Sequence, residues 1–358
     1  MPDFPEISDA KRKRMLEPPS GPVRVVIDTD TANEIDDQFA LAWALLSQDV
    51  LKIEGIYAVP YSFGIYREGL IRTRDLLRDG GEIPLELQRF VGWIKRLNAQ
   101  DRRPEDISFC TPAEGMEESY QEILNVFDKM NLEPKNIYRG SERYLTSYDE
   151  PIQSDAADHL IERALASDEL LYVVAIGALT NVASALLKAP EIAERIVVTW
   201  TAGYPSMTPL YNASFNMEQD MLASTLLFDS GVPLVYLPGF YLGSQLRLSL
   251  AEMETYFKGE GAIGDYLHYL YTHTPLHEQR AIEGHFGRTW VIWDLINFAW
   301  LMNPNWVPSN LVATPSLGDD QFWHLDGKND YPMREAYEID RDSIFRDFFA
   351  KLESFANG

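Results

Sequence analysis

The chain has 358 residues, 46% of them apolar, and a formal net charge of −24. This acidity argues against non-specific binding to nucleic acid or to an anionic membrane, since both need a basic surface, and it favours a soluble enzyme that acts on a neutral or cationic small molecule. The single cysteine, Cys110, rules out an intrachain disulfide and favours a reducing, cytoplasmic compartment.

Residues 1–22 are predicted to form a flexible N-terminal arm. They are polar, they contain the basic run Lys-Arg-Lys-Arg at 11–14, and no apolar run follows that would make a signal peptide. No stretch of the sequence is apolar for long enough to span a bilayer. No linker divides the rest, so residues 23–358 are expected to form a single domain.

The first predicted strand is the β-branched run at residues 25–27. Asp28 and Asp30 end this run. After a polar loop, Asp36 precedes the apolar segment 39–46, which predicts a helix with Asp36 at its N-cap.

Five acidic residues lie within ten positions of this strand-to-helix turn. Like charges at this spacing repel strongly unless something positive lies among them. A set made only of oxygen ligands favours a hard divalent cation, calcium or magnesium. A solvated acidic turn is the alternative, and the metal is favoured because the cluster follows a buried strand. The five residues are Asp28, Asp30, Glu34, Asp36 and Asp37.

Predicted strands and helices alternate along the rest of the chain. Strands that are apolar throughout, alternating with helices, indicate an α/β fold with an open, mostly parallel sheet and helices on both faces. Residues 82–110 are less regular and are expected to form an insertion with a helical piece at 90–97. The predicted strands are 51–59, 170–176, 196–201 and 233–237, and the predicted helices are 67–78, 111–130, 151–167, 220–230 and 295–302.

A second candidate site element is the turn Ile-Gly-Ala-Leu-Thr-Asn at residues 176–181. It follows a predicted strand and begins a helix, which is where ligands bind in open α/β sheets. Taken alone, an ordinary strand-to-helix turn would look the same, with Gly177 making the tight turn and Thr180 or Asn181 as the cap.

A third element, residues 211–220, carries Asn212, Ser214 and Asn216 at alternating positions. In an extended segment these three side chains would lie on one side, and uncharged donors and acceptors suit sugar hydroxyls. A loop with helix caps is the alternative.

The fourth element is Trp-Val-Ile-Trp-Asp-Leu-Ile at residues 290–296, with Asp294 at the head of an apolar helix. An aspartate at this place is also a common N-cap. The element therefore gains weight only together with the other three.

These four elements, in this order, resemble the inosine-uridine-preferring nucleoside hydrolase family. Residues 28–37 are similar to its N-terminal signature, with five residues between the second and third aspartates where the family usually has three, as in a variant branch with an Asn-Glu-x-Asp-Asp form. The turn at 176–181 is similar to Gly-Pro-Leu-Thr-Asn, with Ala178 for proline. Residues 213–216 are similar to Ala-Glu-Phe-Asn, with Ser214 for glutamate. The resemblance covers most of the chain and implies the nucleoside hydrolase fold and a homodimer or homotetramer.

The implied activity is calcium-dependent hydrolysis of the N-glycosidic bond of a ribonucleoside, which releases ribose and base. By this resemblance, Ca²⁺ would be held by Asp30, Asp37, Asp294 and the backbone carbonyl of Ile176. Asp30 would act as general base on a metal-bound water that attacks the anomeric carbon. The expected substrate-binding residues are Asn33, Asp36, Asn212, Ser214, Asn216, Trp293 and Asp294.

The group that protonates the departing base is left open. Many family members have histidine where this chain has Trp293, and stacking of Trp290 or Trp293 on the base would not itself deliver a proton. Alternative acids are the histidines at 273, 277 and 285.

Two other functions are also left open. Residues 28–31, Asp-Thr-Asp-Thr, fit the nucleophile motif of haloacid-dehalogenase-type phosphatases, with residues 318–320 as the distal acidic element, although the pair at 36–37 is not expected there. A non-catalytic protein that binds nucleosides or related glycosides would bind ligand and metal but release no sugar.

Overall fold

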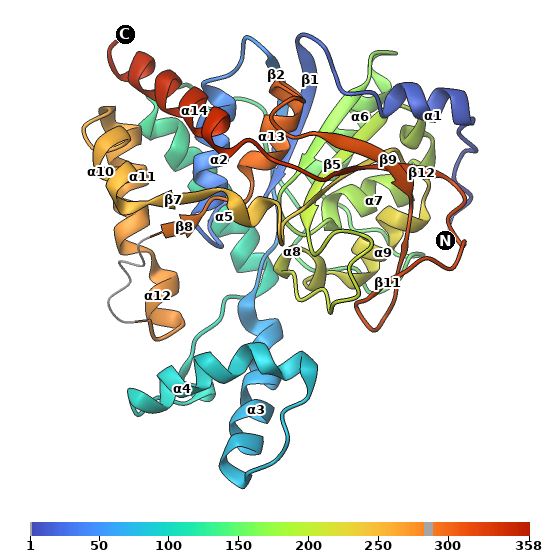
Figure 1. Ribbon diagram of the computed structural model, residues 1–358. Helices are drawn as coiled ribbons and strands as arrows, with labels where there is room; N and C mark the ends of the chain where they lie inside the picture. Colours follow the sequence, from blue (N-terminus) through green and yellow to red (C-terminus); the bar gives the residue numbers. More distant parts are fainter. Residues whose placement is uncertain (1, 283–288) are drawn as a thin grey trace.

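The computed structural model describes residues 2–282 and 289–358. At its centre lies an eight-stranded sheet in the order β3-β2-β1-β4-β5-β6-β12-β9, parallel throughout except for β9, which runs antiparallel to β12 (Figure 1). The strands are β1 (Val23–Thr29), β2 (Leu51–Ala58), β3 (Ile137–Arg139), β4 (Leu171–Ala175), β5 (Ile196–Ala202), β6 (Leu234–Pro238), β9 (Ser309–Ala313) and β12 (Pro332–Ala336).

Helices cover both faces of this sheet because its central strands are apolar on both sides. In β1, Val25 and Ile27 pack into the core beneath α2, α5, α11, α13 and α14, whereas Val26 packs into the core beneath α6, α7 and α9. This confirms the predicted α/β class. These helices are α2 (Asp36–Leu45), α5 (Pro112–Lys129), α6 (Asp155–Leu165), α7 (Thr180–Lys188), α9 (Met221–Asp229), α11 (Gly261–His273), α13 (Leu295–Met302) and α14 (Arg341–Ala356).

Smaller elements complete the domain. Two short antiparallel pairs join β7 (Arg247–Ser249) to β8 (Thr289–Val291) and β10 (Ser316–Leu317) to β11 (Trp323–His324). The short helices are α8 (Phe215–Glu218), α10 (Leu250–Tyr256) and α12 (Pro275–Gln279). None of the helices in the described residues combines the length and apolar character needed to cross a membrane.

The segment before β1 differs from the flexible arm expected from the sequence. Residues 9–15 form helix α1 (Asp9–Met15), and Met15 and Leu16 belong to the main core. The basic run contributes to this packing, because Arg12 is buried with its guanidinium over the ring of Tyr331 and Lys11 forms an ion pair with Glu194. Residues 9–16 are therefore packed against the domain.

The predicted insertion, residues 82–110, contains α4 (Val91–Ala99) and projects from the body of the molecule together with the preceding helix α3 (Arg67–Asp79) (Figure 1). The two helices share a small core, which includes Leu70, Trp93 and Leu97. Ala281, which lies just after α12, is buried in the same core. The insertion therefore supports the chain that follows α12.

Candidate active site

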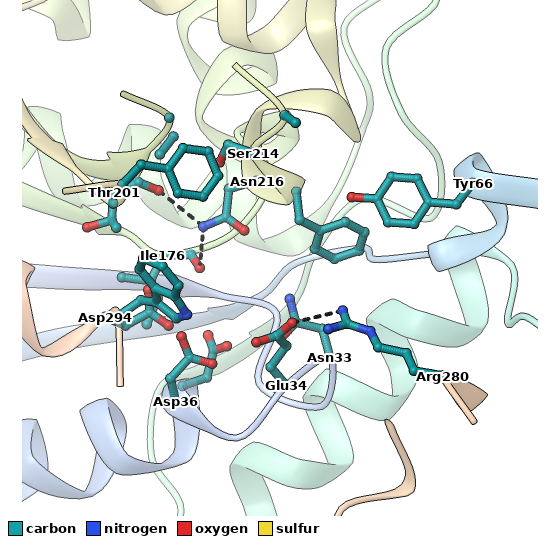
Figure 2. A pocket seen from close by; sticks show the side chains of 18 residues that line it. Asn33, Glu34, Asp36, Tyr66, Ile176, Thr201, Ser214, Asn216, Arg280 and Asp294 are labelled. Carbon is teal, nitrogen blue, oxygen red and sulfur yellow. Dashed lines mark hydrogen bonds and ion pairs between the residues drawn. The ribbon is translucent and has the colours of Figure 1, made fainter. Parts of the chain in front are cut away.

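A cavity of about 290 Å³ lies at the carboxyl ends of the central strands (Figure 2). Asp30 directly follows β1, Ile176 follows β4 and Gly203 follows β5, so neighbouring parallel strands deliver their next residues to one edge. The lining residues are Asn33, Glu34, Asp36, Asp37, Tyr66, Ile176, Thr201, Ala202, Gly203, Ala213, Ser214, Phe215, Asn216, Gly239, Phe240, Arg280, Trp293 and Asp294.

Three carboxylates converge at one end of this cavity. Asp36, Asp37 and Asp294 each offer an oxygen, and these oxygens lie within 4.8 Å of one another. All three residues are buried. Asp36 and Asp37 are the first two residues of α2, while Asp294 precedes α13. The N-cap of α2 is Ile35, so Asp36 does not cap the helix as the sequence suggested, and no cap hydrogen bond is made by its side chain or by that of Asp294.

Asp30 lies beside this trio, fully buried, and does not itself line the cavity. Its Oδ2 accepts hydrogen bonds from Asn33 Nδ2 at 2.8 Å and from Gln219 Nε2 at 3.3 Å. Its Oδ1 is buried without a hydrogen-bond partner among the described residues. A side chain at Gly177 would place Cβ 2.9 Å from Asp30 Cγ, so this close packing requires glycine.

The nearby Asp28 links β1 to the turn at residues 176–181. Its Oδ1 accepts a hydrogen bond from Asn181 Nδ2 at 2.9 Å, and Asn181 Oδ1 in turn accepts from the backbone of Ser141. Burial raises the pKa of Asp28 to about 7. These two bonds connect the end of β1, the start of α7 and the loop that contains Ser141.

Burial raises the pKa of Asp30, Asp36, Asp37 and Asp294 well above the usual aspartate range, and repulsion among these carboxylates raises it further. A positive charge among the four carboxylates would favour their ionised forms and offset this repulsion. The oxygens that converge are all carboxylate oxygens, from Asp36, Asp37 and Asp294, and such a donor set fits a hard divalent cation. The unpartnered Oδ1 of the neighbouring Asp30 is a further buried oxygen outside this group.

Asn216 connects two of the strand ends. Its Nδ2 donates to the carbonyl oxygens of Ile176 and Thr201, each at 3.1 Å (Figure 2). Ile176 itself lines the cavity, and its carbonyl oxygen accepts this bond. Asn33 also lines the cavity, and its Oδ1 is buried without a partner among the described residues, which leaves an acceptor for a hydroxyl.

The structure brings most of the expected substrate-binding side chains to the cavity, but Asn212 was assigned wrongly. Asn212 is fully buried, with Oδ1 accepting from the Tyr204 backbone at 2.8 Å and Nδ2 donating to the Gln321 carbonyl at 3.1 Å. Both polar atoms of the side-chain amide are therefore bonded to the backbone of other loops. The alternation failed because α8 begins at Phe215, so residues 212–216 are not one extended segment.

The aromatic and histidine residues separate into two groups. Trp293 lines the cavity and packs edge-on against Phe240, whereas Trp290 packs against His277, with ring centres 4.9 Å apart. Neither His273 nor His277 lines the cavity. The third suggested acid, at position 285, lies outside the described residues.

Several cavity residues were given no role in substrate binding from the sequence. Glu34 was counted in the acidic cluster and Phe215 lies inside a quoted motif, so proximity to the assigned positions was an available signal. Tyr66 and Arg280 belong to no motif and reach the cavity from the turn before α3 and from the end of α12. Arg280 Nη2 pairs with Glu34 Oε1 at 3.0 Å.

The second acidic element of a phosphatase does not reach this site. Residues 318–320 lie at the turn between β10 and β11, and Asp320 forms an ion pair with His324. None of these three residues lines the cavity. The Asp-Thr-Asp-Thr stretch thus lacks the partner that the phosphatase reading requires.

The chain is similar in sequence to known ribonucleoside hydrolases. The non-specific ribonucleoside hydrolase RihC of Salmonella paratyphi A is 27% identical over 218 residues, which cover 58% of this chain and 67% of that protein. RihC of Shigella flexneri is 32% identical over 142 residues, covering 38% of this chain and 43% of that protein.

Solved structures share the fold. The purine-preferring ribonucleoside hydrolase of Gardnerella vaginalis superposes with a TM-score of 0.62 at 18% identity, covering 93% of this chain and 99% of that chain. The inosine-uridine preferring nucleoside hydrolase of Bacillus anthracis gives 0.55 at 16% identity, covering 92% and 99%. The type III effector XopQ, solved with adenosine diphosphate ribose, gives 0.55 at 15%, covering 97% of each chain.

The family match is broader than any of these pairwise alignments. Residues 25–342 match the family described as inosine-uridine preferring nucleoside hydrolase, and this range contains all four site elements. The chain belongs to the inosine-uridine preferring nucleoside hydrolase family and is an N-ribohydrolase.

Proposed function

We propose that the cavity hydrolyses the N-glycosidic bond of a ribonucleoside with the help of a bound calcium ion. The observation that carries this proposal is the convergence of Asp36, Asp37 and Asp294 beside the buried Asp30, in a cavity that also presents neutral amides and aromatic rings. A hard cation suits this donor set.

By the family resemblance, the ion would be held by Asp30, Asp37, Asp294 and the Ile176 carbonyl. The structure brings the carboxylates of Asp36, Asp37 and Asp294 together, so Asp36 is a further candidate ligand. Calcium bound there would neutralise the clustered carboxylates and lower the pKa of a water at the site. This is the chemistry that the metal supplies; the remaining steps belong to the protein's own side chains.

Asp30 is proposed as the general base. Its Oδ2 is fixed by Asn33 and Gln219, so the free Oδ1 has a defined position from which to accept a proton from the attacking water. A positioned general base contributes roughly 10²–10⁴-fold to the rate.

The sugar and base are proposed to bind along the rest of the cavity. Asn33, Asp36 and Asn216 present acceptors for ring hydroxyls, while Ser214 leaves more room than the usual glutamate of the family. Trp293 and Phe215 offer flat apolar surfaces for the base. Developing positive charge at the anomeric carbon would be stabilised by the surrounding carboxylates.

The test combines metal analysis with a reducing-sugar assay over a panel of purine and pyrimidine ribonucleosides. Protein stripped with a chelator should release no ribose, and calcium should restore release. Phosphate release from p-nitrophenyl phosphate with magnesium would instead support the phosphatase. Binding of nucleoside and calcium with no sugar released would support a non-catalytic binding protein.

A second proposal concerns the oligomeric state and the cellular compartment of the enzyme. We propose a homodimer or homotetramer in the cytoplasm, on the strength of the family resemblance and of Cys110 being the only cysteine. Analytical ultracentrifugation of the purified protein measures the oligomeric state.

A further inference from the structure

Arg280 is the only cationic side chain among the described residues that line the cavity. In Figure 2 it lies on the same side as Tyr66, at the side of the cavity away from Asp294. A sugar bound at the carboxylates would therefore direct its base towards Arg280. In the proposed function, the neutral side chains of the cavity bind the sugar and the carboxylates bind the metal, but Arg280 has no role.

The guanidinium of Arg280 is held from several sides. Nη2 pairs with Glu34 Oε1 at 3.0 Å, and the guanidinium lies over the ring of Phe63 at 5.2 Å. Phe63 stacks on Phe215, with ring centres 4.3 Å apart. Arg280 and Phe215 thus both pack against Phe63, and both line the cavity. The pair with Glu34 uses one N–H of the five that a guanidinium offers.

The insertion fixes the backbone of Arg280. Arg96 Nε, on α4, donates to the Arg280 carbonyl at 3.0 Å, and Arg102 Nη1 donates to the Glu278 carbonyl at 2.8 Å. Ala281 is buried in the core of the insertion. The side chain therefore begins from a backbone that is bonded in place, which is what a preorganised electrostatic group requires.

We infer that Arg280 stabilises the departing base by donating hydrogen bonds to the negative charge that develops on it. The inference rests on the proposed nucleoside hydrolysis. As the C1′–N bond breaks, its electron pair goes to the base, and a water oxygen forms the new bond to C1′. Asp30 takes the proton from that water, and the released base takes a proton from solvent. Arg280 keeps its own proton, because a guanidinium is not deprotonated in proteins.

This role makes the contribution of Arg280 depend on the leaving group. A purine departs as a basic anion and needs the stabilisation, whereas 4-nitrophenolate is stable as an anion and does not. The test therefore compares kcat/KM for inosine with kcat/KM for 4-nitrophenyl riboside, in the calcium-loaded wild type and in Arg280→Met, which removes the donors but keeps an apolar stem over Phe63.

Removing one preorganised donor costs about 10²–10³-fold in rate, so Arg280→Met should lose that much with inosine and change little with 4-nitrophenyl riboside. Arg280→Lys keeps a charge beside Glu34 without the planar fork, and should show a smaller loss with the same selectivity. Arg78→Met, at an exposed arginine of α3, is the control and should behave as wild type with both substrates.

An equal loss with both substrates would overturn the inference, because it would mean that Arg280 only holds the fold or the sugar. Unchanged inosine hydrolysis in Arg280→Met would overturn it as well. Failure of the wild type to release ribose from either substrate would instead overturn the proposed function, and the role of Arg280 with it. Comparable thermal unfolding of all variants excludes misfolding as the cause, and Arg280→Lys carries the test if Arg280→Met does not fold.

Discussion

At the scale of single residues, Asp30 differs from the other site carboxylates in how its two oxygens are used. One is bonded to Asn33 and Gln219, and the other is buried without a partner among the described residues. A carboxylate fixed in this way has a defined orientation, and its second oxygen is left to accept a proton. The carboxylates at positions 36, 37 and 294 are distinguished instead by their proximity to one another.

Replacing Asp30 by asparagine should lower kcat by at least about 10²-fold, because the amide keeps the shape but cannot accept the proton of the attacking water. The protein should still fold, since burying an amide is less costly than burying a charge. Ribose release at saturating nucleoside measures the effect. Asp319→Asn, at an exposed position of the turn between β10 and β11, is the control for the chemical change. Turnover near wild type in Asp30→Asn would remove Asp30 from the mechanism, and an equal loss of turnover in Asp319→Asn would mean that the effect is not specific to position 30.

Glu335, a buried residue on β12 that does not line the cavity, allows a prediction of how stability depends on pH. Burial raises the pKa of Glu335, although its oxygens accept hydrogen bonds from the backbone and hydroxyl of Ser206. A carboxyl with a raised folded-state pKa binds its proton more tightly in the folded state. Its contribution to stability is therefore present below the unfolded-state pKa, near ~4.3, and is lost as the pH rises through the folded-state pKa.

The variant Glu335→Gln lacks this titration. Relative to wild type, it should therefore become more stable as the pH is raised from about 4 to 8, whatever its offset at low pH. Urea unfolding at several pH values measures the difference. Glu338→Gln, at an exposed position three residues later, should show no comparable trend. A difference between wild type and Glu335→Gln that does not change with pH would contradict the prediction.

At the scale of elements, sequence patterns identified those strands and helices whose own composition determines them. The strands β1, β2, β4, β5 and β6 are apolar and bounded by turn residues, and the sequence located each of them within a few residues. β12 was missed because its sequence, Pro-Met-Arg-Glu-Ala, is mixed, and it becomes a strand by pairing with β6 and β9. Register with distant strands is not visible in a local pattern.

The same distinction explains which parts of the site could be predicted. The carboxylates lie in short motifs beside strand ends, so their convergence follows from the parallel sheet. Arg280 meets Glu34 only because the insertion packs against the end of α12, and the two residues are 246 positions apart in the chain. Asn212 shows the reverse error, since a polar residue in a motif was taken for a ligand-binding group when its bonds are internal.

Helix α1 is the element whose role differs most from expectation, and Met15 tests that difference. Met15 is 3% exposed within the main core, so Met15→Ala should destabilise the protein by roughly 2–5 kcal/mol, the range for truncating a fully buried methionine. Lys13→Ala, two positions earlier and exposed, should have little effect. Equilibrium denaturation measures both. A flexible arm would instead leave both variants as stable as wild type.

At the scale of the whole molecule, the net charge of −24 and the buried carboxylates act in the same direction. Self-repulsion destabilises a compact acidic chain, and the cavity concentrates part of that charge where water cannot screen it. Any added salt should therefore stabilise the protein somewhat by screening. A specific ion should do more, because it binds the folded state at one place and is not bound there by the unfolded chain.

Calcium should accordingly raise the free energy of unfolding of metal-free protein along a saturating curve, reaching about 2.7 kcal/mol at a hundred times the dissociation constant. Sodium chloride at matched ionic strength is the control, and should give a smaller, non-saturating rise. Asp37→Asn removes one charge from the trio and should abolish the saturating part while keeping the screening part. If wild type and Asp37→Asn respond alike to calcium, the ion acts through the general acidity of the surface and the carboxylates at 36, 37 and 294 do not hold it.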